Sequence, residues 1–211
     1  MIRFLADIIY LFFFLTLTAP LYPLFNHWNK TGQSHRRSAM AQRMVMNAFH
    51  ICLHFAGVKV IVDGKEKIPP DTAVLYVGNH SSYYDILCSY VATPTGVGFF
   101  AKKEMSKVPC LRHWMEFINC LFLDRTNIKE GLKTMNQGTE YLKQGFSMVI
   151  FPEGTRSQDP EPHTFKEGSL RPALKANVPI IPIAITGTPD IFENNRKYTV
   201  KPSTVYISFG D

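Results

Sequence analysis

The hydrophobic pattern begins with a charge-free stretch over residues 8–25 and then changes to shorter apolar runs. Pro20 and Pro23 predict that a first helix ends or kinks near Thr18, because proline removes a helical hydrogen bond. A membrane-spanning helix needs about 20 apolar residues, so a full span stays open, although a helix inserted into one leaflet fits the early prolines better. A cleaved signal peptide is disfavoured, because Asp7 weakens the charged start and no A-x-A cleavage site follows.

A second helix is predicted over residues 39–55, with Gly57 as its C-terminal cap. Its polar residues form one narrow stripe, namely Arg43, Asn47, His50 and His54. The remaining, wide apolar face must be covered by lipid, by the first helix or by the core of the protein. His50 and His54 share a helical face that would suit a metal, but without a third ligand a solvated stripe is the simpler interpretation.

From residue 58 onward, apolar runs alternate with helical stretches. Strands are predicted at residues 58–62, 73–78, 97–101, 120–124, 147–151, 179–186 and 204–209, and helices at 82–91, 108–117, 128–144 and 169–176. This alternation indicates an α/β fold with a mostly parallel or mixed sheet covered by helices. We therefore divide the chain into a membrane-associated helical segment, 1–57, and an α/β domain, 58–211.

The net charge of +6 is concentrated at the front of the chain. Residues 1–57 contain five Lys or Arg and one acidic residue, a net +4, which leaves +2 for the rest. Basic residues beside apolar sequence favour contact with an anionic membrane and a cytoplasmic location for the segment that follows. No base-stacking or base-reading motif accompanies the charge, so a nucleic-acid partner is not expected.

The four cysteines are not arranged as metal ligands. They are Cys52, Cys88, Cys110 and Cys120, with no C-x-x-C pair and no histidine at zinc-ligand spacing. We expect reduced, mostly buried thiols in a cytosolic environment, and no metal site.

Ligands of parallel α/β sheets bind beyond the carboxyl ends of the strands, so the chemistry is expected in the loops there. The predicted strand at 73–78 runs into N-H-S-S-Y-Y-D at residues 79–85. His80 is suited to accept a proton near neutral pH, and Asp85 fixes its tautomer if one lies before a helix and the other in its first turn. The alternative is structural, because Ser82 and Asp85 also match a helix capping box.

Other strand ends carry cationic and polar residues. The loop after strand 147–151 supplies Glu153, Gly154, Thr155 and Arg156. Its glycine lets a ligand approach the backbone, and its arginine offers a planar fork of donors that matches phosphate oxygens. Lys102 and Arg125 follow two further strands. An ordinary turn with a surface Glu–Arg pair is the alternative, but convergence of several strand ends favours one shared site.

Together these residues resemble the 1-acylglycerol-3-phosphate acyltransferase family. The N-H-x-x-x-x-D block of that family matches Asn79, His80 and Asp85, and its F-P-E-G-T-R-S block matches residues 151–157. A third block matches L-F-L-D-R at 121–125, although Asn119 stands where the family usually has glycine. A fourth block matches residues 178–182, and Lys166 and Gly168 fit the F-K-x-G segment. The blocks follow the family's order and cover about residues 58–211.

The resemblance implies a catalytic domain of the glycerol-3-phosphate acyltransferase type. It implies that His80, oriented by Asp85, is the general base that deprotonates the acceptor hydroxyl. It further implies a phosphate site made by Lys102, Arg125 and Arg156, and shaped by Glu153, Gly154 and Thr155. The turn amides after His80 are candidate donors to the oxyanion of the thioester.

The implied reaction moves a fatty acyl group from acyl-CoA or acyl carrier protein to 1-acylglycerol 3-phosphate, giving phosphatidic acid. The expected partners are this lysophosphatidate, the thioester co-substrate and membrane lipid, with no further cofactor and with the catalytic domain on the cytoplasmic face of the cell membrane. Glycerol 3-phosphate or another lysolipid stays open as the acceptor. A hydrolase that uses His80, Asp85 and Glu153 around a metal or water stays open, as does a non-catalytic peripheral lipid-binding protein.

Overall fold

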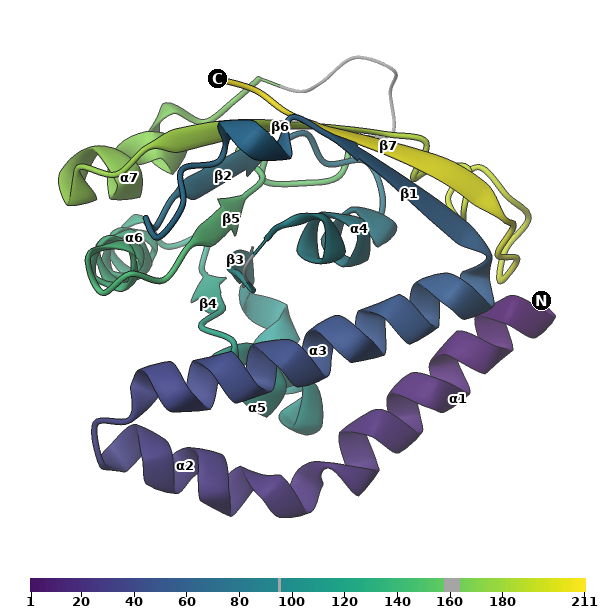
Figure 1. Cartoon of the computed structure of the whole chain (residues 1–211), viewed down its shortest axis with the longest axis horizontal. Coiled ribbons are helices and arrows are strands. Elements are labelled where there is room, and N and C mark those ends of the chain that lie inside the picture. The colour runs from purple at the N-terminus through teal and green to yellow at the C-terminus, as the bar shows by residue number, and fades with distance from the viewer. Residues whose placement is uncertain (95, 158–163) are drawn as a thin grey trace.

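A seven-stranded sheet forms the centre of the computed structural model, which describes residues 1–94, 96–157 and 164–211 (Figure 1). Its strands are β1 (Val58–Asp63), β2 (Leu75–Gly78), β3 (Gly98–Lys102), β4 (Leu121–Leu123), β5 (Met148–Ile150), β6 (Ile180–Thr186) and β7 (Ser203–Phe209). Their order is β1-β7-β6-β2-β5-β3-β4, and every neighbouring pair is parallel except β6 and β7. Each strand overlaps a predicted one, so the expected mixed α/β sheet is confirmed.

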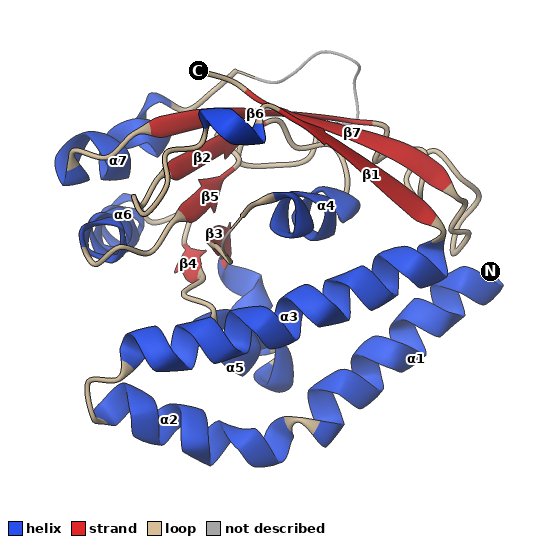
Figure 2. Ribbon diagram, in the orientation of Figure 1, coloured by secondary structure: helices blue, strands red, loops and turns tan. Residues whose placement is uncertain are grey.

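Helices cover the sheet in layers. They are α1 (Ile2–Leu17), α2 (Tyr22–Lys30), α3 (Ser34–Ala56), α4 (Tyr84–Ala92), α5 (Pro109–Phe117), α6 (Ile128–Lys143) and α7 (Arg171–Ala176). In Figure 2, α4 lies between the sheet and α3, while α1 and α2 form an outer layer against α3. Helices α6 and α7 pack together at the other end of the sheet. Because helices enclose the central strands, all three residues of β5 are buried, which explains their uninterrupted apolar sequence.

The front of the chain is more helical than the sequence predicted. Helix α1 ends beside Thr18, as expected, but α2 was not predicted. Pro23 lies in the first turn of α2, where a proline removes no hydrogen bond, so it starts a helix instead of breaking one. Helix α3 begins at Ser34, before the predicted start, and ends at the predicted Gly57, whose φ of 74° is left-handed.

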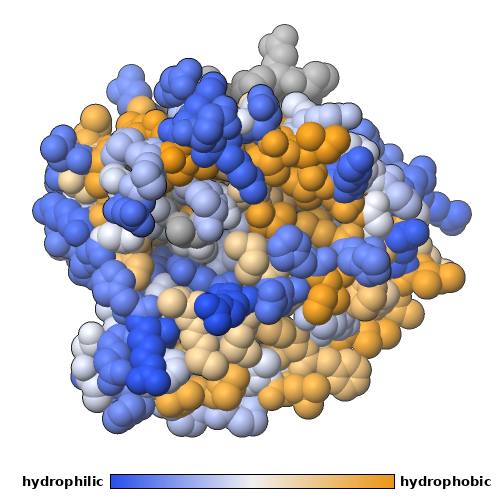
Figure 3. Space-filling model, in the orientation of Figure 1, coloured by the Kyte–Doolittle hydropathy of each residue, from blue (hydrophilic) through white to orange (hydrophobic). Residues whose placement is uncertain are grey.

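Helix α1 has one side against the protein and one exposed, apolar side. Its exposed apolar side chains are Leu5, Ile8, Ile9, Phe12, Phe13 and Leu17, and hydrophobic side chains gather at this part of the surface in Figure 3. On the inner side, Phe14 packs on Trp114, and the buried Asp7 accepts a 2.8 Å hydrogen bond from the Tyr84 hydroxyl. Burial raises the pKa of Asp7 to about 6. By length and composition, Ile2–Lys30 is also apolar enough to cross a membrane.

A buried arginine ties the front helices to the turn before β4. Arg37 of α3 is 6% exposed, and it donates to the side-chain oxygens of Asn29, at 2.8 Å, and Asn119. Asn119 also donates to Ser38 at 2.8 Å. Its φ of 63° is the left-handed conformation that glycine adopts most easily, so the backbone here has a shape that a glycine would also take. Here the asparagine keeps that backbone shape and adds two links to α3.

We expect Asn119→Gly to lower the free energy of unfolding by about 1–3 kcal/mol, even though glycine adopts this left-handed φ most easily. The backbone keeps its conformation, but the buried guanidinium of Arg37 loses an acceptor. Asn177→Gly is the matched control, because Asn177 has a similar φ of 54° and is exposed. Denaturant titration of the detergent-solubilised protein measures both variants. An equal loss of unfolding free energy in the two variants would show that the Asn119 side chain does not stabilise the protein through its hydrogen bonds.

Candidate active site

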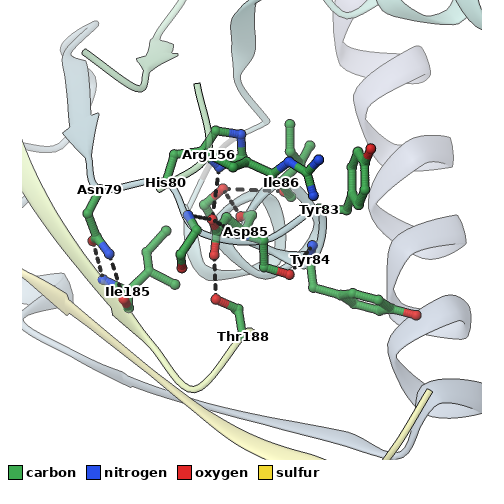
Figure 4. Close-up of polar contacts among 12 residues, drawn as sticks. Asn79, His80, Tyr83, Tyr84, Asp85, Ile86, Arg156, Ile185 and Thr188 are labelled. Atoms are coloured by element: carbon green, nitrogen blue, oxygen red, sulfur yellow. Dashed lines mark hydrogen bonds and ion pairs between the residues drawn. The ribbon is translucent and has the colours of Figure 1, made fainter. Parts of the chain in front are cut away.

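A buried carboxylate holds the histidine of the 79–85 loop (Figure 4). His80 lies in the loop after β2, and its Nδ1 is 2.8 Å from Oδ2 of Asp85, which is in the first turn of α4. Asp85 is fully buried, whereas the His80 side chain is 16% exposed. Because Nδ1 donates to the carboxylate, the other imidazole nitrogen, Nε2, is the one left to accept a proton.

The same carboxylate also organises the start of α4. Oδ2 of Asp85 accepts from the backbone N–H groups of Ser81, at 2.7 Å, and Ser82, at 2.8 Å. Oδ1 accepts from the hydroxyl of Thr188 at 2.5 Å. The hydroxyl of Ser82 accepts from the amide of Tyr84 at 3.0 Å, which completes a capping box. The capping-box and histidine-orienting interpretations therefore hold at once, through one side chain.

The 151–157 loop encloses His80 from the other side. The buried Glu153 accepts from the His80 amide at 2.8 Å, and the His80 carbonyl accepts from the Ser157 amide at 2.8 Å. The imidazole stacks on Phe151, with ring centroids 4.3 Å apart and planes 13° from parallel. Asn79 fixes the start of the loop through paired hydrogen bonds to the backbone of Ile185 in β6, at 2.8 and 2.9 Å. The histidine thus has little freedom to change its position.

These contacts correct one expectation about the oxyanion. The amides of His80, Ser81, Ser82 and Tyr83 all donate to carboxylates. An N–H group that already donates to a buried or half-buried carboxylate is not free to stabilise a developing oxyanion. The turn amides after His80 are therefore structural donors in this conformation.

Glu193, which the sequence analysis did not select, joins three parts of the site. Its Oε2 accepts from the Ser82 hydroxyl at 2.6 Å, and its Oε1 accepts from the Tyr83 amide at 2.9 Å. Oε1 also pairs with Arg156 at 3.1 Å, and that guanidinium lies 3.6 Å from the centre of the Tyr83 ring. Glu193 and Thr188 come from the connection that leaves β6, so the strand-end rule was the one signal that pointed to their region.

A pocket of about 330 Å³ lies at the ends of β3, β4 and β5, against α6 and the start of α7. Its polar wall includes Arg125, Gly154, Lys166 and Arg171, and its apolar wall includes Phe100, Leu132, Met135 and Phe151. Phe151, on which His80 stacks, also lines this pocket, whereas His80, Asp85, Arg156 and Glu193 do not. Burial lowers the pKa of Arg125. A larger pocket, of about 560 Å³, lies near the opposite ends of β2, β3 and β5, away from these side chains.

The structure separates the predicted site residues into groups. His80, Asp85, Glu153 and Arg156 belong to one hydrogen-bonded network. Arg125 and Gly154 line the pocket. Thr155 and Lys102 are exposed, and the amine of Lys102 lies 3.8 Å from a carboxylate oxygen of Glu104.

The described part of the chain places no group of three or more His, Cys, Asp or Glu side chains around a point that would suit a metal ion. His50 and His54 lie on an exposed face of α3. All four cysteines are free thiols, and burial raises the pKa of Cys52 to about 12.

Comparison with known proteins yields a family and several relatives. A family model described as Acyltransferase matches residues 59–186. A probable 1-acyl-sn-glycerol-3-phosphate acyltransferase of Mycoplasma pneumoniae is 34% identical over 160 residues, covering 74% of this chain and 59% of the relative. The 1-acyl-sn-glycerol-3-phosphate acyltransferase of Borreliella burgdorferi is 30% identical over 152 residues, covering 72% and 61%. The matched part of this chain thus spans about three fifths of the length of these relatives.

A solved structure supports the fold. The crystal structure of the 1-acyl-sn-glycerophosphate (LPA) acyltransferase of Thermotoga maritima superposes with a TM-score of 0.68 and 26% sequence identity. The match covers 99% of this chain and 86% of that one.

We expect Glu193→Ala to loosen the 79–85 loop without unfolding the protein. Loss of the acceptor for Ser82 and Tyr83 should speed amide exchange in that segment about tenfold, the effect of roughly 1.4 kcal/mol. Asp190→Ala is the control, because Asp190 is exposed in the same connection and accepts from Asn194 at 2.8 Å. Hydrogen–deuterium exchange followed by mass spectrometry measures both. Identical deuterium uptake in segment 79–85 in the two variants would show that Glu193 does not hold this loop in place.

Proposed function

The chain belongs to the acyltransferase family, and on this basis we propose that it transfers a fatty acyl group from a thioester to the free hydroxyl of 1-acylglycerol 3-phosphate, giving phosphatidic acid. The donor is acyl-CoA or acyl carrier protein. The observation that supports the proposal best is the 2.8 Å contact between His80 and Asp85. A pocket with cationic and apolar walls lies at the ends of the neighbouring strands β3, β4 and β5. The names of the similar proteins point to the same acceptor.

In the proposed mechanism, Nε2 of His80 takes the proton of the acceptor hydroxyl as its oxygen attacks the thioester carbonyl carbon. Asp85 stabilises the imidazolium that forms and keeps the ring in one tautomer. Collapse of the tetrahedral intermediate breaks the carbon–sulfur bond, and the imidazolium returns its proton to the departing thiolate. The steps need no covalent acyl-enzyme and no other cofactor. General-base assistance of this kind contributes on the order of 10²–10⁴ in rate.

The predicted substrate-binding residues divide into two roles under this proposal. Arg125 and Gly154, which line the pocket, contact the acceptor directly. Glu153 and Arg156 act through the His80 loop, because their carboxylate and guanidinium are engaged there. Lys102 and Thr155 stay predictions as acceptor ligands; both are exposed to an approaching head group.

The exposed face of α1 fits a helix that lies in one leaflet. Its 16 residues give a length of about 24 Å, short of the roughly 30 Å hydrocarbon core. Its inner side is occupied by Asp7, Phe14 and their partners in the protein. We propose that the outer face enters the cytoplasmic leaflet, which brings the active site to its lipid acceptor. The exposed Lys30, Arg36 and Arg43 favour anionic lipid, whereas Arg37 is buried and takes no part.

We expect His80→Ala to lower kcat/KM for lysophosphatidate by about 10²–10⁴. His50→Ala, which changes an exposed histidine of α3, should keep full activity. The assay uses purified protein with acyl-CoA and acyl carrier protein donors and with lysophosphatidate, glycerol 3-phosphate or lysophosphatidylcholine as acceptor. Release of free fatty acid without an acceptor would identify a hydrolase. Full acyl transfer by His80→Ala would refute the mechanism.

We expect Leu17→Asp to weaken binding to anionic vesicles about ten- to a hundredfold, since burying a leucine is worth roughly 1.5–3 kcal/mol. Leu174→Asp is the matched control, because Leu17 and Leu174 are 74% and 72% exposed and lie on α1 and α7 respectively. Vesicle flotation measures both variants. Equal binding by both would place the membrane contact elsewhere than on α1.

A further inference from the structure

The first turns of α1 touch the active-site region at two points. Asp7 accepts a 2.8 Å hydrogen bond from the hydroxyl of Tyr84, the first residue of α4. Three residues earlier, Phe4 stacks on Phe192, with ring centroids 5.5 Å apart and planes 6° from parallel. Phe192 lies directly before Glu193 in the connection between β6 and β7, and Figure 1 shows the N-terminus of the chain beside this connection. Helix α1 thus reaches both the start of α4 and the segment that carries Glu193.

These two contacts lie on either side of a hydrogen bond that joins the same two segments. The Ser82 hydroxyl donates to Glu193 at 2.6 Å and accepts from the Tyr84 amide at 3.0 Å. Tyr83, which lies between Ser82 and Tyr84, is in ring contact with Phe192, with 6.4 Å between the centroids. One contact of α1 therefore supports the segment that supplies the donor, and the other supports the segment that supplies the acceptor.

Asp7 is an unusual residue for the inner side of an apolar helix. It is 6% exposed, and within the part of the chain that the structure describes its Oδ1 has no hydrogen-bond partner. Arg3, one turn earlier, donates instead to the carbonyl of Phe55 at 2.7 Å. An apolar residue would join two helices at lower cost, because a buried carboxylate with one hydrogen bond regains little of its lost hydration. Adhesion of α1 to the protein therefore does not explain Asp7, whereas a need to fix the Tyr84 hydroxyl does.

We propose that Asp7 and Phe4 are positioning residues for the reaction. By holding the start of α4 and the β6–β7 connection in place, they keep the hydrogen bond between Ser82 and Glu193 closed and fix the position of His80. This inference rests on the proposed function. It gives α1 a part in catalysis that is separate from its contact with lipid, because the two side chains act from the inner side of the helix.

The first test removes the carboxylate. We expect Asp7→Ala to speed amide exchange in segment 79–85 about three- to tenfold and to lower kcat by a similar factor, the effect of one lost hydrogen bond. KM for lysophosphatidate should be nearly unchanged, because no contact to the substrate is removed.

Two variants of similar size separate the hydrogen bond from packing. Asp7→Asn should restore both kcat and the exchange rate, since its amide oxygen can still accept from the Tyr84 hydroxyl. Asp7→Leu fills the same space with an apolar side chain, and it should keep the faster exchange and the lower kcat. Wild-type behaviour of Asp7→Leu would overturn the inference.

Phe4→Ala and Phe14→Ala form a matched pair for the second contact. Both phenylalanines are half-buried on α1, but Phe14 packs on Trp114 of α5, with 5.0 Å between the ring centroids. We expect Phe4→Ala to speed exchange in segment 79–85 and to lower kcat, and Phe14→Ala to leave both at the wild-type level. Equal effects would show that the loop responds to any loosening of α1, and Phe4 would lose its assigned role.

Vesicle flotation separates positioning from membrane contact. Because Asp7 lies on the inner side of α1, Asp7→Ala should bind vesicles of phosphatidylcholine and phosphatidylglycerol as the wild type does. If Asp7→Ala loses vesicle binding while segment 79–85 exchanges at the wild-type rate, Asp7 serves the membrane contact and the inference fails.

The exchange measurement also separates this inference from the proposed function. If the wild type acylates lysophosphatidate, but Asp7→Ala matches it in kcat and in exchange, the positioning role fails and the proposed function stands. If the wild type acylates no phosphate-bearing acceptor, but Asp7→Ala speeds exchange in segment 79–85 and Asp7→Asn reverses this, the proposed function fails and the hold of α1 on the loop stands.

Discussion

The buried carboxylate of Asp85 is the interaction on which the rest of the site depends. It is fully buried and accepts from the imidazole of His80, the amides of Ser81 and Ser82, and the hydroxyl of Thr188. A buried anion is costly unless its lone pairs are satisfied, so the chain must bring all these donors together whenever it folds. The orientation of the histidine is therefore a consequence of satisfying the carboxylate.

A second constraint concerns which cations are engaged. Arg156 forms an ion pair with Glu193, and Lys103 forms one with Asp124. Carboxylates of the protein itself therefore fix the positions of these two cations. Hydrogen bonds from Lys103 and Thr126 keep the pKa of Asp124 well below its usual range. The cations that line the pocket at the ends of β3, β4 and β5 have a different environment, with aromatic and aliphatic neighbours. Pairing, more than charge itself, separates the cations that position a loop from those that line the pocket.

The front helices are part of the same folded unit as the sheet. Phe25 and Trp28 of α2, and Ala41 and Val45 of α3, belong to the hydrophobic cluster that also contains strand residues. Asp7 links α1 to Tyr84, the residue directly before Asp85. Under the proposed membrane contact of α1, a short chain of contacts through Asp7 and Tyr84 joins the membrane surface to the 79–85 loop.

The sequence by itself determined the strands, most of the helices and which loops carry the candidate site residues. Strand positions followed from short β-branched runs, and the loops at their carboxyl ends, including His80, Asp85 and Arg125, followed from the rule for parallel sheets. Helix α2 was missed because Pro23 is equally compatible with ending a helix and with starting one.

Only the tertiary structure decided which partner each group takes. Glu193 bonds Ser82 from 111 residues away and Thr188 bonds Asp85 from 103 residues away, distances at which no local pattern specifies a pair. Glu193, the partner of Arg156, could not be found from the sequence for the same reason. The F-P-E-G-T-R-S motif alone implied that Arg156 binds phosphate. The physical reason is that periodicity reflects burial along one element, whereas a hydrogen bond between distant loops depends on the strand order that brings them together.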